Sequence, residues 1–196
     1  MERLVRQFLL KLLTGERAIV LRKNVPSQEE LRANLENIDA IGLYLHIPFC
    51  EQICPYCPYN KELYRDSLAE RYVAALKTEM DFYSAIVRDK PVTSVYIGGG
   101  TPTTMLHNGL GEIIDYMRNE FNLQCDIHME SHPNHLSAGN LSRIKALGVQ
   151  HLSLGVEALF DRHLKFLRRP YTANDVREAV RRAVSAGFKC VNVDVM

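Results

Sequence analysis

Three cysteines stand close together in the sequence and have the spacing of a ligand set. Cys50, Cys54 and Cys57 form a C-x3-C-x2-C pattern within YLHIPFCEQICPYC, and two further cysteines stand alone. A disulfide framework uses an even number of dispersed cysteines, and thiols in a reducing compartment more often ligate metal. We therefore interpret the three as metal ligands. We expect Cys125 and Cys190 to be buried core thiols, because free cysteine is among the most buried residue types.

Three thiolates in one loop can hold three corners of a [4Fe–4S] cluster and leave the fourth iron without a protein ligand. The amino and carboxylate groups of S-adenosylmethionine (SAM) can chelate such an iron. One electron passed to the sulfonium then breaks a carbon–sulfur bond and gives a 5′-deoxyadenosyl radical. Structural zinc is an alternative, with His46 as fourth ligand, but only Cys54–Cys57 fits half of the usual paired C-x2-C pattern. An ordinary ferredoxin cluster would need a fourth nearby cysteine.

A glycine run follows a strand-like segment in VYIGGGTPT, residues 95–103. Glycine lets the backbone approach a ligand closely, so the carbonyls and amides at this strand end could bind the ammonium and carboxylate of methionine. The run could also be a simple turn. A phosphate cradle fits less well, because the sequence has neither G-x-G-x-x-G nor the lysine of a P-loop here.

Alternating elements from residue 40 onward predict an α/β fold with a parallel sheet. We expect strands at 41–47, 92–97, 125–130, 151–156 and 189–196, and helices at 66–87, 110–120, 137–147 and 173–186. The sheet could be a barrel or an open, doubly wound sheet, and both place their chemistry at the carboxyl ends of the strands. The cysteine loop, the glycine run, Glu130, Glu157 and Asp194 all fall at that edge.

The three carboxylates at strand ends could accept hydrogen bonds from ribose hydroxyls. Alternatively, they face solvent or pair with Arg168 or Arg169. His128, His132 and His135 also lie near one strand end, where a metal site is conceivable. Because strand spacing sends their side chains in different directions, we expect them to be solvent-exposed surface histidines instead.

Residues 1–39 carry no chemical motif and are predicted to form a helical extension before the main domain at 40–196. We expect a helix at 3–13, a short strand at 16–25 and a helix from Pro26-Ser27 to about Asn37. Arg6 and Lys11 interrupt the apolar stretch at the N-terminus, so this stretch does not have the pattern of a signal peptide. A net charge of +1 implies no attraction to nucleic acid or membrane. No apolar run has the roughly 18 residues that a membrane span needs, and we expect a cytoplasmic protein.

Several segments of the sequence together resemble a known family. The segments YLHIPFCEQICPYC, YIGGGTPT, MESHP, LSLGVE and NVDVM, with the Arg169 region, are similar in order to oxygen-independent coproporphyrinogen III oxidases and HemW-type haem chaperones, the HemN-like radical SAM group. The resemblance runs from about residue 40 to the end. It implies that Cys50, Cys54 and Cys57 ligate the cluster. Its implied SAM contacts are Tyr44 in the pocket, Tyr56 at adenine, Gly99, Gly100 and Thr101 at methionine, and Glu130, Arg169 and Asp194 elsewhere.

The resemblance also implies a fold, partners and an activity. The fold is a partial (β/α) barrel of six units, of which the sequence holds the first five, so we expect an incomplete core or an inactive truncated fragment. The partners are a tetrapyrrole or haem and a low-potential electron donor. In the oxidase reaction, a hydrogen is abstracted from a propionate and carbon dioxide leaves. The alternatives are a haem chaperone or another HemN-like enzyme, such as a methyltransferase.

One position bears on that choice, and a second departs from the family pattern at a predicted ribose contact. Oxidases of this type carry another cysteine just after the third ligand, whereas here Cys57 is followed by Pro58-Tyr59-Asn60, which favours the chaperone or another branch. The family usually has glutamine where this chain has Glu157, and an ionised carboxylate accepts but does not donate hydrogen bonds.

Overall fold

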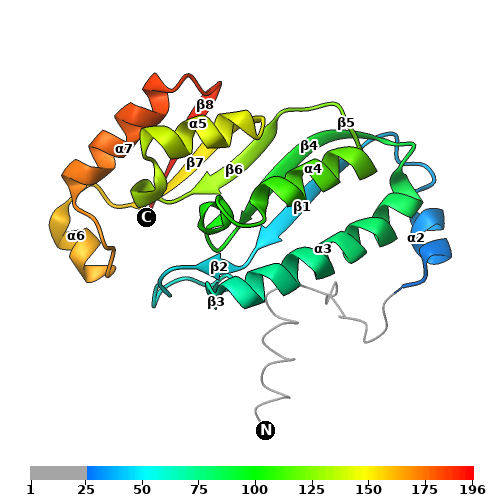
Figure 1. Ribbon diagram of the computed structural model, residues 1–196, viewed down its shortest axis with the longest axis horizontal. Helices are drawn as coiled ribbons and strands as arrows, with labels where there is room; N and C mark the ends of the chain where they lie inside the picture. Colours follow the sequence, from blue (N-terminus) through cyan, green and yellow to red (C-terminus); the bar gives the residue numbers. More distant parts are fainter. Residues whose placement is uncertain (1–25) are drawn as a thin grey trace, which may run out of the picture.

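A computed structural model describes residues 26–196 of the chain. Its centre is a parallel sheet whose main strands lie side by side in chain order (Figure 1). These strands are β1 (Ile41–Ile47), β4 (Pro91–Gly99), β6 (Ile127–Ser131), β7 (Val149–Glu157) and β8 (Cys190–Val195). A two-residue strand, β5 (Asn122–Leu123), also pairs with β4. The five predicted strands and their parallel pairing are therefore confirmed.

Helices connect successive strands, as parallel pairing requires. The expected helices at 66–87 and 110–120 are confirmed to the residue. The helices are α2 (Gln28–Leu35), α3 (Asp66–Val87), α4 (Leu110–Glu120), α5 (Ala138–Ala146), α6 (Asp161–Phe166) and α7 (Ala173–Ser185). Sequence reasoning missed the short α6. Within residues 26–196, no helix is both long and apolar enough to cross a membrane.

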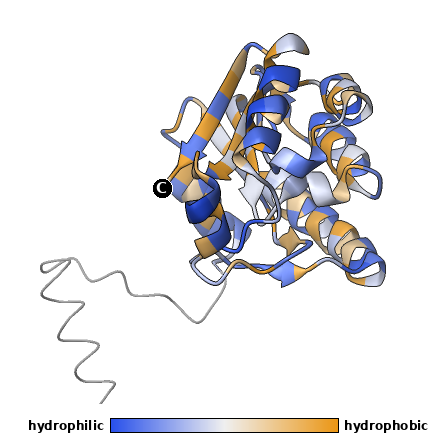
Figure 2. Cartoon of the chain, turned by 90° about the vertical axis from the view of Figure 1, so that its left-hand side faces the viewer, coloured by the Kyte–Doolittle hydropathy of each residue, from blue (hydrophilic) through white to orange (hydrophobic). Residues whose placement is uncertain are grey.

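The core lies between the sheet and the helices, because alternate strand residues point to opposite faces. Leu45 and Ile47 of β1, and Val95 and Ile97 of β4, are buried there against α3 and α4. The strand that reaches the C-terminus alternates between hydrophobic and hydrophilic residues (Figure 2). The opposite face of the sheet is polar and open, and Tyr44, with 58% of its surface exposed, lies on it.

Two cysteines depart from expectation. Cys190 is exposed and Cys125 is only half-buried, so the prediction that both are buried core thiols is wrong. Cys190 begins β8, which pairs only with β7 among the described strands. Its side chain lies on the polar face rather than the helix-covered one, and Cys125 lies in the loop that precedes β6.

The start of the chain is described only from residue 26. The predicted helix at 3–13 and strand at 16–25 lie outside the described residues. The predicted third element is present as α2, and the Ser27 side chain accepts a hydrogen bond from the Glu30 backbone N–H to cap it, as serine commonly does at helix starts.

Candidate functional site

The cysteine loop is anchored at both ends on the core. Beyond β1, the two-residue strand β2 (Phe49–Cys50) pairs in parallel with β3 (Glu62–Leu63), and the loop that carries the other two cysteines lies between them. The ring of Phe49 is 1% exposed and meets the rings of Tyr64 and Tyr72 edge-on, with centroids 6.0 and 5.4 Å apart. The first cysteine of the motif therefore follows a fixed, buried aromatic anchor.

The glycine run lies directly against this anchor. The N–H of Gly100 donates to the Ile47 carbonyl at 2.7 Å, and the N–H of Thr101 donates to the Phe49 carbonyl at 2.7 Å. A Cβ on Gly100 would lie 2.7 Å from the carbonyl oxygens of Pro48 and Phe49. Glycine is thus needed here for close packing of backbone on backbone.

These contacts restrict what the run can offer a ligand. The Gly99 N–H, at a φ of 119°, donates to Glu130 Oε2 at 3.0 Å. The N–H groups of Gly99, Gly100 and Thr101 therefore all have protein partners. These three amides are therefore not free to bind a ligand.

The motif residues converge on one cavity of about 620 Å³. All three motif cysteines line it, together with Tyr56, Gly99, Gly100, Thr101, Glu130, Glu157, Arg169 and Asp194. Among the predicted residues, Tyr44 does not line this cavity. Its hydroxyl bonds His46 Nδ1 at 3.0 Å, and its ring stacks on Tyr96 with centroids 6.1 Å apart.

A second depression, of about 760 Å³, lies on the outer side of the cysteine loop. Glu51, Tyr59 and Lys61 line both hollows. The outer depression contains none of the three cysteines and no strand-end residue of the main sheet. The residues that could bind a metal or take part in chemistry therefore line the inner cavity.

Arg169 ties the cysteine loop to the ends of the strands. Its Nε donates to the Tyr171 hydroxyl at 2.6 Å, and its Nη2 donates to the Gly155 carbonyl at 2.8 Å. Its Nη1 lies 3.2 Å from Cys54 Sγ and 3.3 Å from the Tyr56 hydroxyl. Arg169 thus links Cys54 of the cysteine loop to Gly155 of β7.

A hydroxyl faces the first cysteine in a similar way. Thr101 Oγ1 lies 3.7 Å from Cys50 Sγ. Burial raises the pKa of the Cys50 thiol, and the Thr101 contact opposes that rise. Each of these two cysteines therefore has a donor beside its sulfur.

The three strand-end carboxylates all line the cavity, and among residues 26–196 two of them have hydrogen-bond partners. Glu130 accepts from the Tyr96 hydroxyl at 2.9 Å as well as from Gly99. Asp194 accepts from the Ser153 hydroxyl at 3.1 Å and the Asn192 amide at 2.8 Å. Neither group pairs with an arginine among the described residues. Burial raises the pKa of Glu157, and nearby Arg169 opposes the rise.

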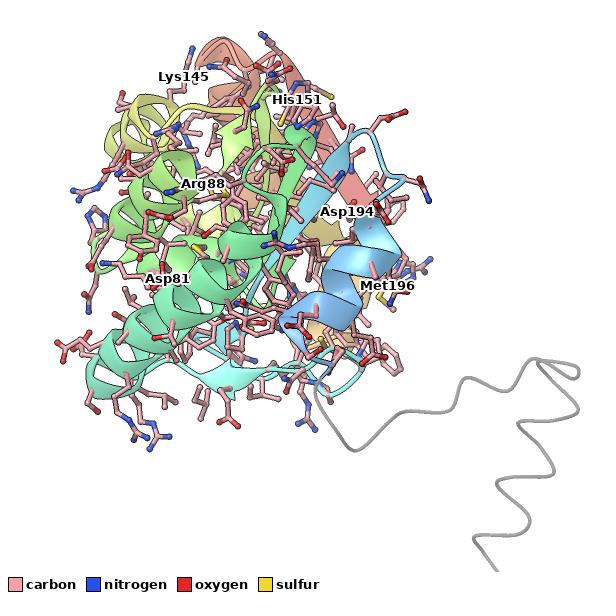
Figure 3. The ribbon with its side chains drawn as sticks, turned by 90° about the vertical axis from the view of Figure 1, so that its right-hand side faces the viewer. Asp81, Arg88, Lys145, His151, Asp194 and Met196 are labelled. Carbon is pink, nitrogen blue, oxygen red and sulfur yellow. The ribbon has the colours of Figure 1, made fainter. Side chains whose placement is uncertain are left out.

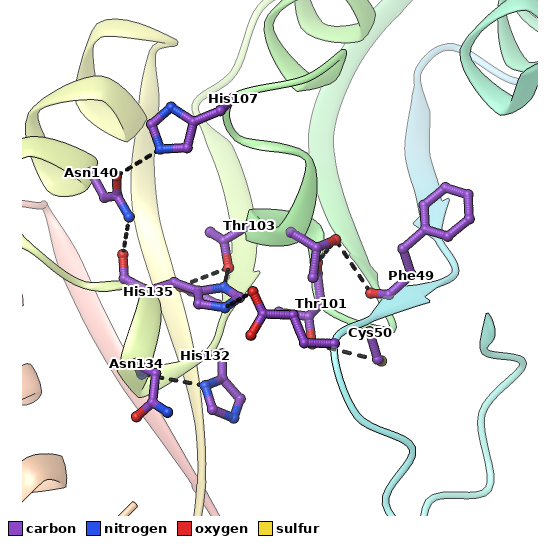
Figure 4. A network of polar contacts seen from close by, with 12 residues as sticks. Phe49, Cys50, Thr101, Thr103, His107, His132, Asn134, His135 and Asn140 are labelled. Atoms are coloured by element: carbon purple, nitrogen blue, oxygen red, sulfur yellow. Dashed lines mark hydrogen bonds and ion pairs between the residues drawn. The ribbon is translucent and has the colours of Figure 1, made fainter. Parts of the chain in front are cut away.

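Two of the three nearby histidines belong to the cavity wall, so the expectation of solvent-exposed surface residues is wrong for them. The short 3-10 helix η2 (Pro133–His135) turns the chain back after Glu130 and brings His132 and His135 inward. His135 Nδ1 bonds the Thr103 hydroxyl at 2.7 Å, and its Nε2 lies 3.2 Å from Glu51 Oε1 (Figure 4). Sequence reasoning missed this link between η2 and the cysteine loop.

The remaining histidine, His128, lies elsewhere. Its ring stacks on that of His151 with centroids 4.0 Å apart. His151 lies towards the opposite end of the sheet from Met196 (Figure 3), whereas Met196 lines the cavity. This pair is therefore separate from the cavity.

The donor set fits a cluster better than a zinc ion. Both ring nitrogens of His46, the proposed fourth zinc ligand, are engaged, by the Tyr44 hydroxyl and by the Asn60 carbonyl at 2.9 Å. Within residues 26–196, no three Cys, His, Asp or Glu side chains lie close enough together to share one metal ion. A cubane makes a different demand, because each cysteine binds a different iron. Three thiols that line one cavity offer three such ligands.

Comparison with known proteins identifies a family. Residues 44–196 match the family described as the radical SAM superfamily, which is most of the chain. The chain belongs to the radical SAM superfamily.

Relatives within the superfamily include proteins of two kinds. The chain is 34% identical over 156 residues to the haem chaperone HemW of Bacillus subtilis, covering 78% of this chain and 41% of that protein. It is 30% identical over 162 residues to the oxygen-independent coproporphyrinogen III oxidase of Pseudomonas aeruginosa, covering 80% of this chain and 35% of that protein. The chain thus spans about 40% of the length of the curated relatives it matches.

A solved structure supports the fold. The coproporphyrinogen III oxidase HemN of Escherichia coli, described as a radical SAM enzyme, superimposes with a TM-score of 0.82 at 23% sequence identity. The match covers 95% of this chain and 45% of that one. The predicted α/β fold of radical SAM type is therefore confirmed.

Proposed function

We propose that this radical SAM chain binds a [4Fe–4S] cluster on Cys50, Cys54 and Cys57, and SAM in the adjoining cavity. The observation that carries the proposal is the convergence of the three thiols, the strand-end glycines and three carboxylates on one cavity. When bound, the cluster and SAM would supply one-electron reductive cleavage of a carbon–sulfur bond. The electron would come from a low-potential donor protein or reductant.

The residues around the cavity would bind and orient the two cofactors. The carbonyls of Gly99 and Gly100, with the Thr101 hydroxyl, would face the methionine part of SAM. Glu130 would accept from its ammonium group, and Asp194 and Glu157 from ribose hydroxyls. Tyr56 would lie against adenine. Arg169 would hold the cysteine loop in position through the contacts described above.

The test of this proposal is SAM cleavage. The chain is reconstituted with iron and sulfide without oxygen, reduced with dithionite in the presence of SAM, and analysed for 5′-deoxyadenosine by chromatography. We expect product from the wild type and none from Cys54→Ser. Cys190→Ser is the matched control, because Cys190 is exposed and lies outside the cavity. If reconstituted wild-type chain forms no 5′-deoxyadenosine, the proposed enzyme activity is wrong.

For the substrate, we propose a tetrapyrrole, as in coproporphyrinogen III oxidases. A haem chaperone is the second candidate, and two observations favour it. Relatives at 34% and 30% identity carry the name haem chaperone, and no cysteine follows Cys57 directly, since Pro58 and Tyr59 stand there. A haem titration followed by absorption spectroscopy separates the two. Stoichiometric haem binding without porphyrinogen turnover supports the chaperone, and absence of haem binding removes it.

A further inference from the structure

The short helix α6 and the residues beside it expose large apolar side chains. Leu159, Phe160 and Phe166 have 49%, 62% and 84% of their surface exposed. The helix is nevertheless held against the body of the protein, because Leu164 on its other side is 1% exposed. Exposed apolar side chains gathered in one place mark a surface that binds another molecule.

Basic side chains accompany these apolar residues. Arg162, Lys165 and Arg168 are exposed, and none of them forms an ion pair in the part of the chain that the structure describes. Asp161 is the only acidic residue between positions 159 and 170, and its carboxylate accepts a backbone N–H of α7 at 2.7 Å. The whole chain has a net charge of only +1, so positive charge is concentrated here. We define the α6 surface by its apolar and basic residues, which are Leu159, Phe160, Arg162, Lys165, Phe166 and Arg168.

The α6 surface lies next to the cysteine loop. The Gln52 side chain in that loop donates to the Arg168 carbonyl at 3.0 Å. The next residue, Arg169, has its Nη1 3.2 Å from Cys54 Sγ. Figure 1 shows α6 at the outer edge of the molecule, at the same end of the sheet as β2 and β3. A protein bound to the α6 surface would therefore lie beside a cysteine of the motif without entering the cavity.

The outer depression on the cysteine loop is a weaker candidate for a charged partner. Its lining contains two acids, Glu51 and Glu62, beside two bases, Lys61 and Arg65. The Lys61 ammonium already donates to two carbonyls of the cysteine loop. Its charges therefore balance, whereas those of the α6 surface are of one sign.

We propose that the α6 surface binds a low-potential electron-transfer protein whose own surface is acidic. This inference rests on the proposed function, because such a protein supplies the electron that SAM cleavage needs. The flavin or iron–sulfur centre of the donor loses one electron, and the [4Fe–4S] cluster gains it. Electron-transfer complexes are weak and bury less than about 1,200 Å² in total, so a small surface is enough. Opposite charges speed the encounter of the two proteins.

The first experiment measures binding and does not depend on turnover. Dissociation constants of a flavodoxin, an acidic flavin protein, are measured by biolayer interferometry on the full chain after reconstitution without oxygen. Lys165→Glu reverses one charge of the α6 surface, and Phe166→Ala removes its most exposed ring. The matched controls are Arg143→Glu and Val184→Ala, which change exposed side chains of α5 and α7 outside this surface.

We expect Lys165→Glu and Phe166→Ala each to weaken flavodoxin binding by roughly fivefold or more, and both controls to stay within about twofold of the wild type. Added salt should weaken binding of the wild type more than that of Lys165→Glu, because it screens the attraction. If Lys165→Glu binds as tightly as Arg143→Glu, or if the wild type does not bind flavodoxin, the inference is overturned. Circular dichroism checks folding, and should Lys165→Glu fail to fold, the comparison of Phe166→Ala with Val184→Ala decides in the same way.

A second experiment connects binding with reduction. Formation of 5′-deoxyadenosine is compared between limiting reduced flavodoxin and excess dithionite, a small reductant that needs no docking surface. We expect Lys165→Glu and Phe166→Ala to be slower than their controls with flavodoxin and equal to them with dithionite. Equal slowing with both reductants overturns the inference, because the changes would then act on the cavity.

Other occupants of the α6 surface give different results. If a second copy of the chain binds there, sedimentation shows a dimer that Phe166→Ala dissociates, while flavodoxin affinity stays unchanged. If further sequence of a longer protein covers the surface, the longer protein does not bind flavodoxin although this chain does. Either result overturns the inference. Failure of the proposed function is distinct, because the reconstituted wild type then forms no 5′-deoxyadenosine with dithionite, whether or not it binds flavodoxin.

Discussion

Replacing Gly100 with alanine tests the backbone contact that joins the glycine run to the cysteine loop. The new Cβ would lie 2.7 Å from the carbonyl oxygens of Pro48 and Phe49, and 2.8 Å from the carbonyl carbon of Pro48. These atoms belong to the backbone, so no change of side-chain rotamer relieves the overlap. The end of β4 and the segment after β1 must separate, which weakens the bonds from Gly100 and Thr101 to Ile47 and Phe49.

The expected cost follows from these two effects. Overpacking of a tight site costs about 1–3 kcal/mol, and weakening two backbone hydrogen bonds adds about 1 kcal/mol. We therefore expect Gly100→Ala to lower the free energy of unfolding by roughly 3 kcal/mol. The assay is urea unfolding of the cluster-free, reduced chain, followed by circular dichroism.

Gly139→Ala provides the matched control. Gly139 lies in the first turn of α5, and a Cβ there would meet no atom within 4 Å. Alanine favours helix over glycine by up to about 1 kcal/mol, so this variant should be as stable as the wild type or slightly more so. If Gly100→Ala unfolds within about 0.5 kcal/mol of Gly139→Ala, the two segments do not pack as described.

Three further predictions concern the cavity and the exposed cysteine. Arg169→Met should lower the free energy of unfolding in urea by about 2 kcal/mol, because the hydrogen bonds of the guanidinium disappear. Arg168 is exposed, so Arg168→Met should change this free energy by no more than about 0.5 kcal/mol. Equal losses in the two variants would contradict the prediction. The pKa of His132 falls from 6.5 to about 3 on folding, so the unfolded chain binds more protons between these values. The free energy of unfolding should therefore decrease as the pH is lowered from 6.5, by about 2 kcal/mol at pH 5. The decrease should be less steep in His132→Gln. If urea unfolding gives the two proteins parallel profiles of stability against pH, the prediction is wrong. Iodoacetamide should modify exposed Cys190 before Cys125 in the folded chain, and peptide mass spectrometry showing the reverse order would contradict the placement of β8.

Much of the fold could be predicted from local patterns. The helix at 66–87 carries its apolar residues on one face, and the five strands alternate regularly with helices, so element type and order follow from periodicity. The rule that parallel strands gather chemistry at their carboxyl ends also placed the cysteine loop, the glycine run and three carboxylates around one cavity. These features depend on short-range sequence.

The missed features depend on contacts between distant segments. Spacing within β6 could not reveal that η2 turns His132 and His135 into the cavity, because a 3-10 turn breaks the strand period. Cysteine composition could not reveal that Cys190 lies on the open face of β8, which pairs only with β7 in the part of the chain that the structure describes. The engaged amides of the glycine run likewise depend on its packing against the segment after β1.

Electron paramagnetic resonance of the reconstituted chain tests the central claim most directly. Chain prepared without oxygen should contain about four irons and four sulfides, and after reduction it should give the signal of a one-electron-reduced [4Fe–4S] cluster. That signal should change when SAM is added, because one iron has no protein ligand. A cluster signal that SAM leaves unaltered, or a chain that holds zinc while its three motif thiols remain reduced, would contradict the assignment.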